Sequence, residues 1–424
     1  MQEIKLNPNL SKVKESATLK INQQAKKLRE EGRVVYHWGF GESPFPVPQE
    51  IQNELKKRTS HKEYVTTAGL PLLRETIADY YQSKYQITSI NKENTFIGPG
   101  SKELLFQLLY ILEGDFIIPT PSWVSYLPQL QLKNANVHIA HTSRENGYRL
   151  TADILEETCQ QSNSDQRILI LNSPSNPTGQ VYSQEDLEKL VPILEKYNVI
   201  VISDEIYSQV DFTHEHSPSL ASLYTKTVIT GGLSKSYSAG GYRLGYMILA
   251  SEMENVGKAL KSFISETFSA VSAPIQYCAV KAWDLSEKNV FKRVALYTQI
   301  HSIIGRYFAL RFQKMNIHTT PAQGAFYLFI DFENYRDQLK NLNIQTSSDL
   351  SNYLINELGI AILPGCDFYR EYNELSARVA FVDYDGKAIL EKLKENKLDQ
   401  SLILQTYPQL KNGLDKLESF LKQL

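Results

Sequence analysis

The segment Gly232-Leu-Ser-Lys235-Ser-Tyr-Ser-Ala-Gly-Gly241-Tyr-Arg243-Leu-Gly245 is the most informative part of the chain. It joins two apolar runs, residues 227–230 and 244–249, that are typical of buried strands. A partly desolvated lysine among small residues, with an arginine eight positions further on, suits an imine-forming nucleophile. Most lysines are solvated surface residues, so other segments must support this interpretation.

Further strand-like runs precede this segment at residues 95–97, 115–119, 137–140, 167–171 and 199–203. Stretches of helical period lie between them, for example at residues 102–112, 152–161 and 184–197. These stretches are long enough to connect parallel strands, so the pattern predicts an α/β fold with a mainly parallel sheet of seven strands.

The pattern changes after a helical segment at residues 287–314. Strands are expected at residues 317–320, 325–331 and 377–382, and helices at residues 385–394 and 408–424. This order predicts a second, smaller α+β unit.

Four further motifs place polar groups where α/β proteins bind ligands. Gly98-Pro-Gly100-Ser101-Lys102 lies between a strand and a helix, where backbone N–H groups can hold a phosphate. Asn172-Ser-Pro-Ser-Asn176-Pro-Thr-Gly179 and Asp204-Glu-Ile-Tyr207 follow two successive strands, which puts them at one sheet edge. Arg378 lies on a late apolar strand, where a cation requires an anion.

Together these motifs resemble the class I/II aminotransferases, which are pyridoxal 5'-phosphate (PLP) enzymes of fold type I with the aspartate-aminotransferase fold. The resemblance covers nearly the whole chain. It implies a large PLP-binding domain at residues 48–300 and a small domain made of residues 1–47 and 301–424. It also implies a homodimer, because active sites of this fold lie between two subunits.

The resemblance implies a role for each matching residue toward the cofactor. Lys235 would form the internal aldimine and shuttle the proton, Asp204 would pair with the pyridine nitrogen, and Tyr207 would complete the catalytic set. The other residues implied to contact PLP are Gly100, Ser101, Lys102, Trp123, Asn176, Ser234 and Arg243, together with Tyr64, which would reach the phosphate of the neighbouring subunit.

The substrate would be held mainly by Arg378, which would bind the α-carboxylate in a bidentate way. The other residues implied to contact it are Gly41, Trp123, Asn176, Lys102, Ser16 and Thr18. Lys102, Ser16 and Thr18 match the prokaryotic-type aspartate aminotransferases at positions that recognise a distal carboxylate. The sequence Gly41-Glu-Ser-Pro departs from the usual Gly-Glu-Pro of that branch by one inserted residue.

The expected reaction is a transamination in two half-reactions between an L-amino acid and a 2-oxo acid, with aspartate or glutamate and 2-oxoglutarate as the best match. Three alternatives remain open on the same fold. They are an aminotransferase for aromatic or other amino acids, a C–S β-lyase or synthase, and a non-catalytic PLP-binding regulator. The last is least favoured, because the full catalytic set is present and the short N-terminal segment leaves no room for a helix-turn-helix domain.

The composition mainly excludes certain partners and sites. The chain has 424 residues, with 45 basic and 47 acidic side chains, so its charge of −2 gives no reason to expect a nucleic-acid partner. No apolar run is long enough for a membrane span, and no signal-peptide pattern occurs at the N-terminus, so we expect a cytoplasmic protein. Neither the three cysteines nor the histidine pairs His138/His141 and His214/His216 have a diagnostic metal-site spacing, so no metal is expected.

Overall fold

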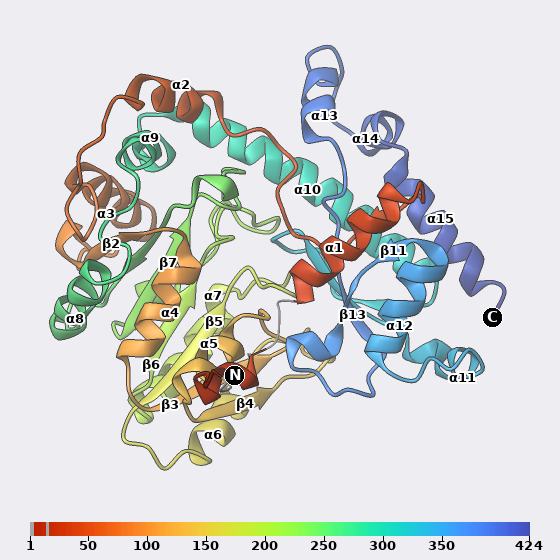
Figure 1. Ribbon diagram of the computed structural model, residues 1–424, viewed down its shortest axis with the longest axis horizontal. Helices are drawn as coiled ribbons and strands as arrows, with labels where there is room; N and C mark the ends of the chain where they lie inside the picture. The colour runs from red at the N-terminus through yellow and green to blue at the C-terminus, as the bar shows by residue number, and fades with distance from the viewer. Residues whose placement is uncertain (1–3, 14–16) are drawn as a thin grey trace.

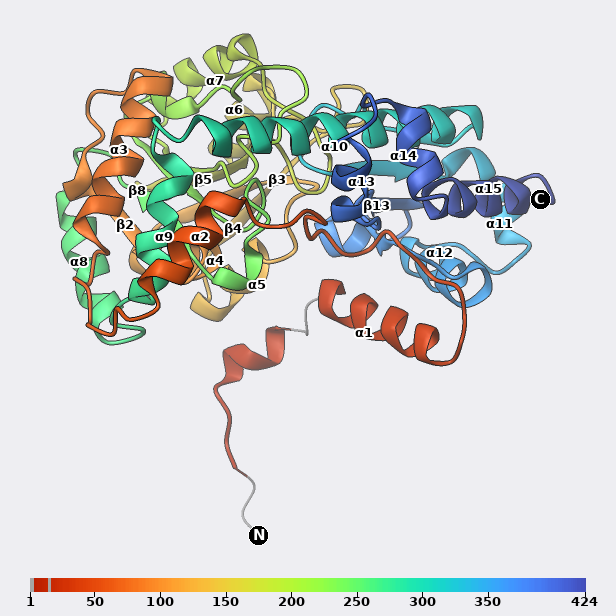
Figure 2. The same ribbon diagram turned by 90° about the horizontal axis from the view of Figure 1, so that it is seen from above.

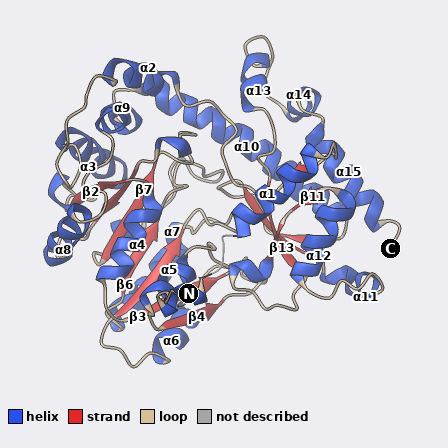
Figure 3. Ribbon diagram, viewed as in Figure 1, coloured by secondary structure: helices blue, strands red, loops and turns tan. Residues whose placement is uncertain are grey.

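The structure is a computed structural model that describes residues 4–13 and 17–424 (Figure 1). Within this part of the chain, the strands form one sheet of seven, one of four and one of two. Figure 3 shows the seven-stranded sheet on the left and the smaller sheets on the right, with helices around both.

The seven-stranded sheet has the order β2-β8-β7-β6-β5-β3-β4. Strand β8 is antiparallel to its neighbours β2 and β7, and the pairs from β7 to β4 are parallel. This confirms the predicted α/β fold with a mainly parallel seven-stranded sheet. The strands are β2 (Thr95–Gly98), β3 (Asp115–Thr120), β4 (Val137–His141), β5 (Arg167–Asn172), β6 (Ile200–Asp204), β7 (Thr227–Gly232) and β8 (Gly245–Ile248).

Helices cover both faces of this sheet, so the central strands are mainly apolar and carry polar residues chiefly near their ends. Phe116 and Ile118 of β3 pack on one face with α4, α5 and α8, whereas Ile117 packs on the other face with α6 and α7. Helices α3 and α9 cover the second face near β2, β7 and β8. The helices are α2 (Gln49–Arg58), α3 (Pro71–Tyr85), α4 (Ser101–Ile111), α5 (Tyr126–Lys133), α6 (Ala152–Gln160), α7 (Gln184–Lys196), α8 (Glu254–Ser265) and α9 (Ala273–Trp283).

The four-stranded sheet is antiparallel, with the order β12-β13-β10-β9, and the parallel pair β1-β11 lies beside it. Its core joins both ends of the chain, because Trp38 packs edge-on against Phe308 at a ring-centroid distance of 5.4 Å. The elements are α1 (Ala17–Glu30), β1 (Tyr36–His37), β9 (His318–Thr319), β10 (Tyr327–Asp331), α11 (Arg336–Lys340), α12 (Ser347–Tyr353), β11 (Ile360–Ala361), β12 (Leu363–Pro364), β13 (Ser376–Ala380), α13 (Gly386–Lys392), α14 (Gln400–Thr406) and α15 (Gln409–Leu421).

Helix α10 (Lys288–Lys314) connects the two larger sheets. Figure 1 shows it starting beside α2 and α9, and Figure 2 shows it running through the upper part of the molecule from the helices of the large sheet to the side of the small sheet. Its first half contributes Val290 and Val294 to the core near α3 and α9, and its second half contributes Phe308 and Phe312 to the core of the small sheet. One continuous helix therefore belongs to both cores.

The predicted boundaries differ from the structure mainly at turns. The strand expected at residues 325–331 begins only at Tyr327, because Ala325 has a φ of +52° and Gly324 forms an isolated bridge with Asp211. A positive φ is incompatible with a regular strand. Among the described residues, no helix combines the length and the hydropathy that crossing a membrane requires.

The two cores joined by α10 give a stability prediction. Phe308→Ala removes a fully buried ring, so we expect a loss of about 3–5 kcal/mol in the free energy of unfolding of the region around the small sheet. Leu310→Ala, on the same helix, changes a side chain that is 55% exposed and should stay within about 0.5 kcal/mol. Urea unfolding followed by circular dichroism measures both variants, and equal midpoints would contradict the packing described for α10.

Candidate active site

A cavity of about 450 Å³ lies between the carboxyl edge of the seven-stranded sheet and the small sheet. Helix α4, the ends of β5 and β6, the segment after β7 and strand β13 all contribute to its wall. The residues singled out from the sequence that line it are Thr18, Gly41, Ser101, Lys102, Trp123, Asn176, Asp204, Tyr207, Ser234, Lys235, Arg243 and Arg378.

Two of the remaining candidates, Gly100 and Tyr64, do not line the cavity. Gly100 lies directly behind its wall, because a Cβ atom at this position would stand 2.3 Å from Nη2 of Arg243. Tyr64 is 93% exposed in the segment between α2 and α3. Ser16 lies outside the described residues, so its predicted contact with the substrate is not visible.

The start of α4 forms an anion cradle with Arg243. The guanidinium donates hydrogen bonds to the carbonyl groups of Gly240 at 2.8 Å and Pro99 at 3.1 Å, which holds it against the first turn of α4. Gly100 has a φ of +99°, and a side chain there would collide with the guanidinium. Free N–H groups at a helix N-terminus, a serine hydroxyl and a guanidinium together favour a phosphate group.

Asp204 ends strand β6 at the floor of the cavity and is fully buried. Its Oδ2 atom accepts a hydrogen bond of 2.6 Å from the hydroxyl of Tyr126, and its Oδ1 atom accepts one of 3.2 Å from Thr230. Burial raises the pKa of the carboxyl group, and these hydrogen bonds partly oppose that effect. A cationic group at the cavity floor would stabilise the ionised carboxylate, and the protonated ring nitrogen of PLP is such a group.

Lys235 reaches into the cavity from the segment after β7. Its ammonium donates a hydrogen bond of 2.7 Å to the carbonyl oxygen of Gly41. The rings of Tyr207 and Phe326 face it, with centroids 5.6 and 5.5 Å from Nζ. The hydroxyl of Tyr207 in turn lies 2.8 Å from that of Tyr327. A primary amine, a phenol and a buried carboxylate therefore surround the same space.

Arg378 brings a buried cation from strand β13 to the opposite wall. Its guanidinium donates to Oδ1 of Asn176 at 3.1 Å and to the carbonyl oxygen of Gly39 at 2.6 Å. Nε has no hydrogen-bond partner among the described residues, although the side chain is only 2% exposed. Burial is the main cause that lowers the pKa of this group. A buried guanidinium with an unused donor and neutral partners fits the carboxylate of a ligand.

Lys102 adds a further cation near the start of α4. Its Nζ atom lies 4.9 Å from the centroid of the Trp123 ring. Loss of solvent around the ammonium lowers its pKa, and the charges of Arg243 and Lys235 lower it further, although part of the side chain remains exposed. Like charges that gather in one cavity favour an anionic ligand.

Sequence reasoning missed several residues of the site. Tyr126 follows Trp123 by three residues, and this spacing at a helix start could have pointed to it. Thr230, Tyr327 and Gly39 gave no comparable signal, because their contacts depend on how distant segments pack.

Glu205, next to Asp204, is buried outside the cavity. Its carboxylate accepts hydrogen bonds from the hydroxyl groups of Ser219 at 2.6 Å, Ser203 at 3.0 Å and Tyr81 at 3.3 Å. Successive side chains of an extended chain point to opposite sides, so the two neighbouring carboxylates occupy separate environments.

The histidine pairs have carboxylate partners that the sequence did not reveal. His138 Nε2 lies 2.9 Å from Asp115 Oδ2, and His214 Nδ1 lies 3.1 Å from Asp211 Oδ2. Among the described residues, no three His, Cys, Asp or Glu side chains are grouped so that they could hold a metal ion.

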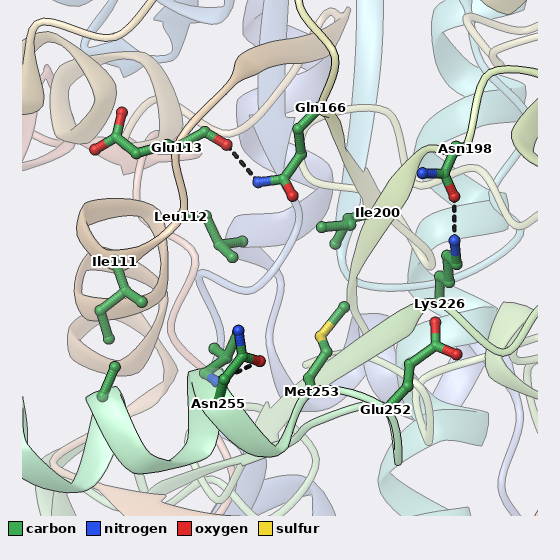
Figure 4. Close-up of a pocket in the computed structure, with 12 residues that line it drawn as sticks. Ile111, Leu112, Glu113, Gln166, Asn198, Ile200, Lys226, Glu252, Met253 and Asn255 are labelled. Atoms are coloured by element: carbon green, nitrogen blue, oxygen red, sulfur yellow. Dashed lines mark hydrogen bonds between the residues drawn. The ribbon is translucent and has the colours of Figure 1, made fainter.

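A second cavity of about 530 Å³ opens at the other edge of the seven-stranded sheet, where its parallel strands begin (Figure 4). Gln166 donates a hydrogen bond to the carbonyl oxygen of Glu113, and Lys226 donates one to the side chain of Asn198. These polar groups pair with one another and are spread around the rim, so we assign the active site to the smaller cavity beside Lys235.

Comparisons with known proteins agree with this geometry. The family model for aminotransferase class I and II matches residues 33–384. An aspartate aminotransferase of Geobacillus stearothermophilus is 31% identical over 374 residues, which cover 86% of this chain and 92% of that protein. An asparagine–oxo-acid transaminase of Streptococcus mutans is 28% identical over 375 residues, with the same coverage of 86% and 92%.

Among solved structures, an aspartate aminotransferase of Thermus thermophilus with maleate matches with a TM-score of 0.84. The match covers 98% of this chain and 100% of that one, at 22% sequence identity. At this identity the likeness shows a shared fold.

Because the carboxyl group of Glu205 is buried, we expect the free energy of unfolding to depend on pH. Burial raises its pKa from 4.5 to about 7, so between these pH values the native state keeps a proton that the unfolded chain releases. Stability is therefore lost as the pH rises through this window, by up to about 3 kcal/mol. Glu205→Gln cannot titrate, so its urea midpoint relative to the wild type should rise between pH 5 and pH 7.5.

Glu157→Gln on α6, an exposed position, serves as the control for the loss of a surface carboxyl group. If the difference between Glu205→Gln and the wild type stays constant with pH, the carboxyl group does not titrate in this window.

Proposed function

Because the chain belongs to the class I and II aminotransferases, we propose that it transfers the amino group of L-aspartate to 2-oxoglutarate. It is a PLP-dependent enzyme of fold type I. The observation that carries the substrate proposal is the presence of two cations, Arg378 and Lys102, on different elements of one cavity. A dicarboxylic substrate supplies one carboxylate for each.

The residues present fit the cofactor, although the roles of single residues are part of the proposal. The anion cradle of Gly100, Ser101 and Arg243 fits its phosphate, supported by Ser234 in the same wall. Asp204 fits its ring nitrogen, and Trp123 offers an aromatic face beside the cavity. When bound, PLP supplies an aldehyde that reacts with amines and a ring that withdraws electrons from the substrate Cα.

The chain's own groups would then orient the substrate and move its proton. Arg378 binds the α-carboxylate through its two terminal nitrogens or through the unused Nε donor. Lys235 Nζ would take up the proton from the substrate Cα and return it to the carbon on the other side of the substrate nitrogen, because its flexible side chain lets the amine reach both positions. Asp204 stays ionised and holds the ring nitrogen protonated, and Tyr207 and Asn176 donate hydrogen bonds toward the ring oxygen.

Lys102 would bind the distal carboxylate of the substrate, with Thr18 of α1 beside the same cavity. Ser16 is part of this proposal by sequence alone. The aspartate aminotransferase of Geobacillus stearothermophilus supports the choice of aspartate, whereas the Streptococcus mutans relative acts on asparagine according to its name. Both amino donors therefore belong in the test.

We also propose a homodimer with two domains per subunit, residues 48–300 and residues 1–47 with 301–424. Tyr64 supports the dimer, since an aromatic side chain that is 93% exposed is available to a second subunit. The domain boundaries are supported by the core that joins Trp38 and Phe45 to residues beyond 297. The cytoplasmic location expected from the sequence remains a prediction.

The reaction itself gives the first test. Aspartate added without an oxo acid should change the absorbance of the bound cofactor and release one oxaloacetate per site. Lys235→Ala should lower this half-reaction about 10²- to 10⁴-fold, because proton transfer loses its base. The same assay is repeated with asparagine, phenylalanine and a cysteine conjugate as amino donors. A stronger response to phenylalanine would contradict the choice of aspartate, and pyruvate with ammonia from the conjugate would favour a β-lyase.

Substrate selectivity gives the second test. Lys102→Ala should lower kcat/KM for aspartate about 10- to 100-fold, because one charge-assisted contact is lost. For alanine, which has no distal carboxylate, kcat/KM should change less than about threefold. Lys258→Ala on α8 is a matched control, since this lysine is exposed and forms an ion pair with Glu254 on the same helix. An equal loss for both substrates would assign Lys102 to the cofactor alone.

A further inference from the structure

Tyr369 has a backbone conformation that side chains rarely adopt. It follows the short 3₁₀ turn Gly365–Phe368, between β12 and β13, with φ +69° and ψ +23°. The left-handed region is unfavourable for residues other than glycine, and a tyrosine there requires compensating contacts. The contacts of its side chain supply this compensation.

The hydroxyl of Tyr369 bridges both ends of the turn that leads into α5. It donates a hydrogen bond of 3.0 Å to the carbonyl oxygen of Trp123 and accepts one of 3.1 Å from the N–H of Leu127. Both partners lie on the seven-stranded side of the cavity, whereas Tyr369 belongs to the chain that leads into the strand of Arg378. One phenol therefore fixes the backbone on both sides of the Trp123 turn.

The two neighbours of Tyr369 extend this connection. The carbonyl oxygen of Phe368 accepts a hydrogen bond of 3.2 Å from the N–H of Ser122, and Arg370 donates one of 2.8 Å to the carbonyl oxygen of Thr142. Each of residues 368–370, which we call the latch, thus forms a hydrogen bond with a segment that follows β3 or β4.

The packing of the Tyr369 ring and the hydrogen bonds of Arg370 also hold the latch in place. The Tyr369 ring packs against the apolar cluster of α4, α5 and the sheet, to which Trp123 and Leu127 also belong. Burial raises the pKa of its hydroxyl, so the group stays protonated and can donate to Trp123. Arg370 is held by two hydrogen bonds to Glu374, at 3.0 and 2.8 Å.

We propose that Tyr369 is a positioning residue that holds the Trp123 ring against the cofactor site through the backbone of the Trp123–Leu127 turn. This inference rests on the proposed contact between Trp123 and PLP. No part of it requires Tyr369 to touch the cofactor or the substrate, and Tyr369 does not line the cavity. Its effect on the cofactor must therefore pass through Trp123.

Cofactor retention by the holoenzyme tests the proposal. The rate of PLP loss after dilution is followed by absorbance in the wild type, Tyr369→Phe, Trp123→Leu and the double variant. Tyr369→Phe keeps the ring and removes two hydrogen bonds, so PLP should dissociate about 5- to 20-fold faster than from the wild type. In the Trp123→Leu background, Tyr369→Phe should raise the rate of PLP loss by less than about twofold.

Tyr372→Phe is the matched control, because Tyr372 lies in the same loop and is 62% exposed. It should retain PLP as the wild type does. Hydrogen exchange of the amides at residues 122–127, measured by mass spectrometry, should become faster in Tyr369→Phe and not in Tyr372→Phe. Unchanged exchange, or an equal effect of Tyr369→Phe with and without Trp123, would overturn the positioning role.

The outcome for Trp123→Leu separates this inference from the proposed function. If Trp123→Leu retains PLP like the wild type, the proposed contact of Trp123 is wrong and the positioning role fails with it. If Trp123→Leu loses PLP faster and Tyr369→Phe does not, only the role of Tyr369 is wrong.

Discussion

Burial of the central strands on both faces is the constraint from which the rest of the structure follows. Strands β3, β5, β6 and β7 have helices on both sides, so their middle residues must be apolar. Polar groups are excluded until the strands end, and all the parallel strands end at the same edge. Asp204 at the end of β6, Asn172 at the end of β5 and Asn176 just after β5 therefore reach the same cavity, although they are separated in the chain.

The cavity gathers more positive than negative groups, and this imbalance selects its ligands. Four cations, Lys102, Lys235, Arg243 and Arg378, line it, against two carboxylates, Asp204 at its floor and the exposed Glu42. Arg378 is the extreme case, since its hydrogen-bond partners are an amide and a carbonyl group rather than a carboxylate. A buried cation with neutral partners is costly, and a bound carboxylate offsets this cost. A cofactor phosphate and a dicarboxylic substrate together supply the missing negative charge.

The sequence predicted the parts of the site that depend on local order. Lys235, Asp204 and Ser101 each follow or precede a strand in a recognisable motif, so their position at the sheet edge could be expected. The hydroxyl of Tyr126 on Asp204 and that of Tyr369 on the Trp123 turn could not, because they depend on packing between segments 78 and 246 residues apart. The late start of β10 was missed for a related reason, since the turn at Ala325 is set by its bond to Val210.

The connections between the two larger sheets limit how they can move. Beside α10, the segment before β10 is bound to loops after β5 and β6, through the bonds from Gly324 N–H to Gly179 and from Ala325 N–H to Val210, at 2.9 and 2.7 Å. Gly179 has a φ of +68°, and a side chain there would stand 2.2 Å from the carbonyl oxygen of Tyr327, so these backbones approach closely. At this junction the small sheet is therefore tied to the large one through backbone groups. The latch adds a second connection between the two sides of the cavity, made by the hydroxyl of Tyr369, the guanidinium of Arg370 and the carbonyl group of Phe368.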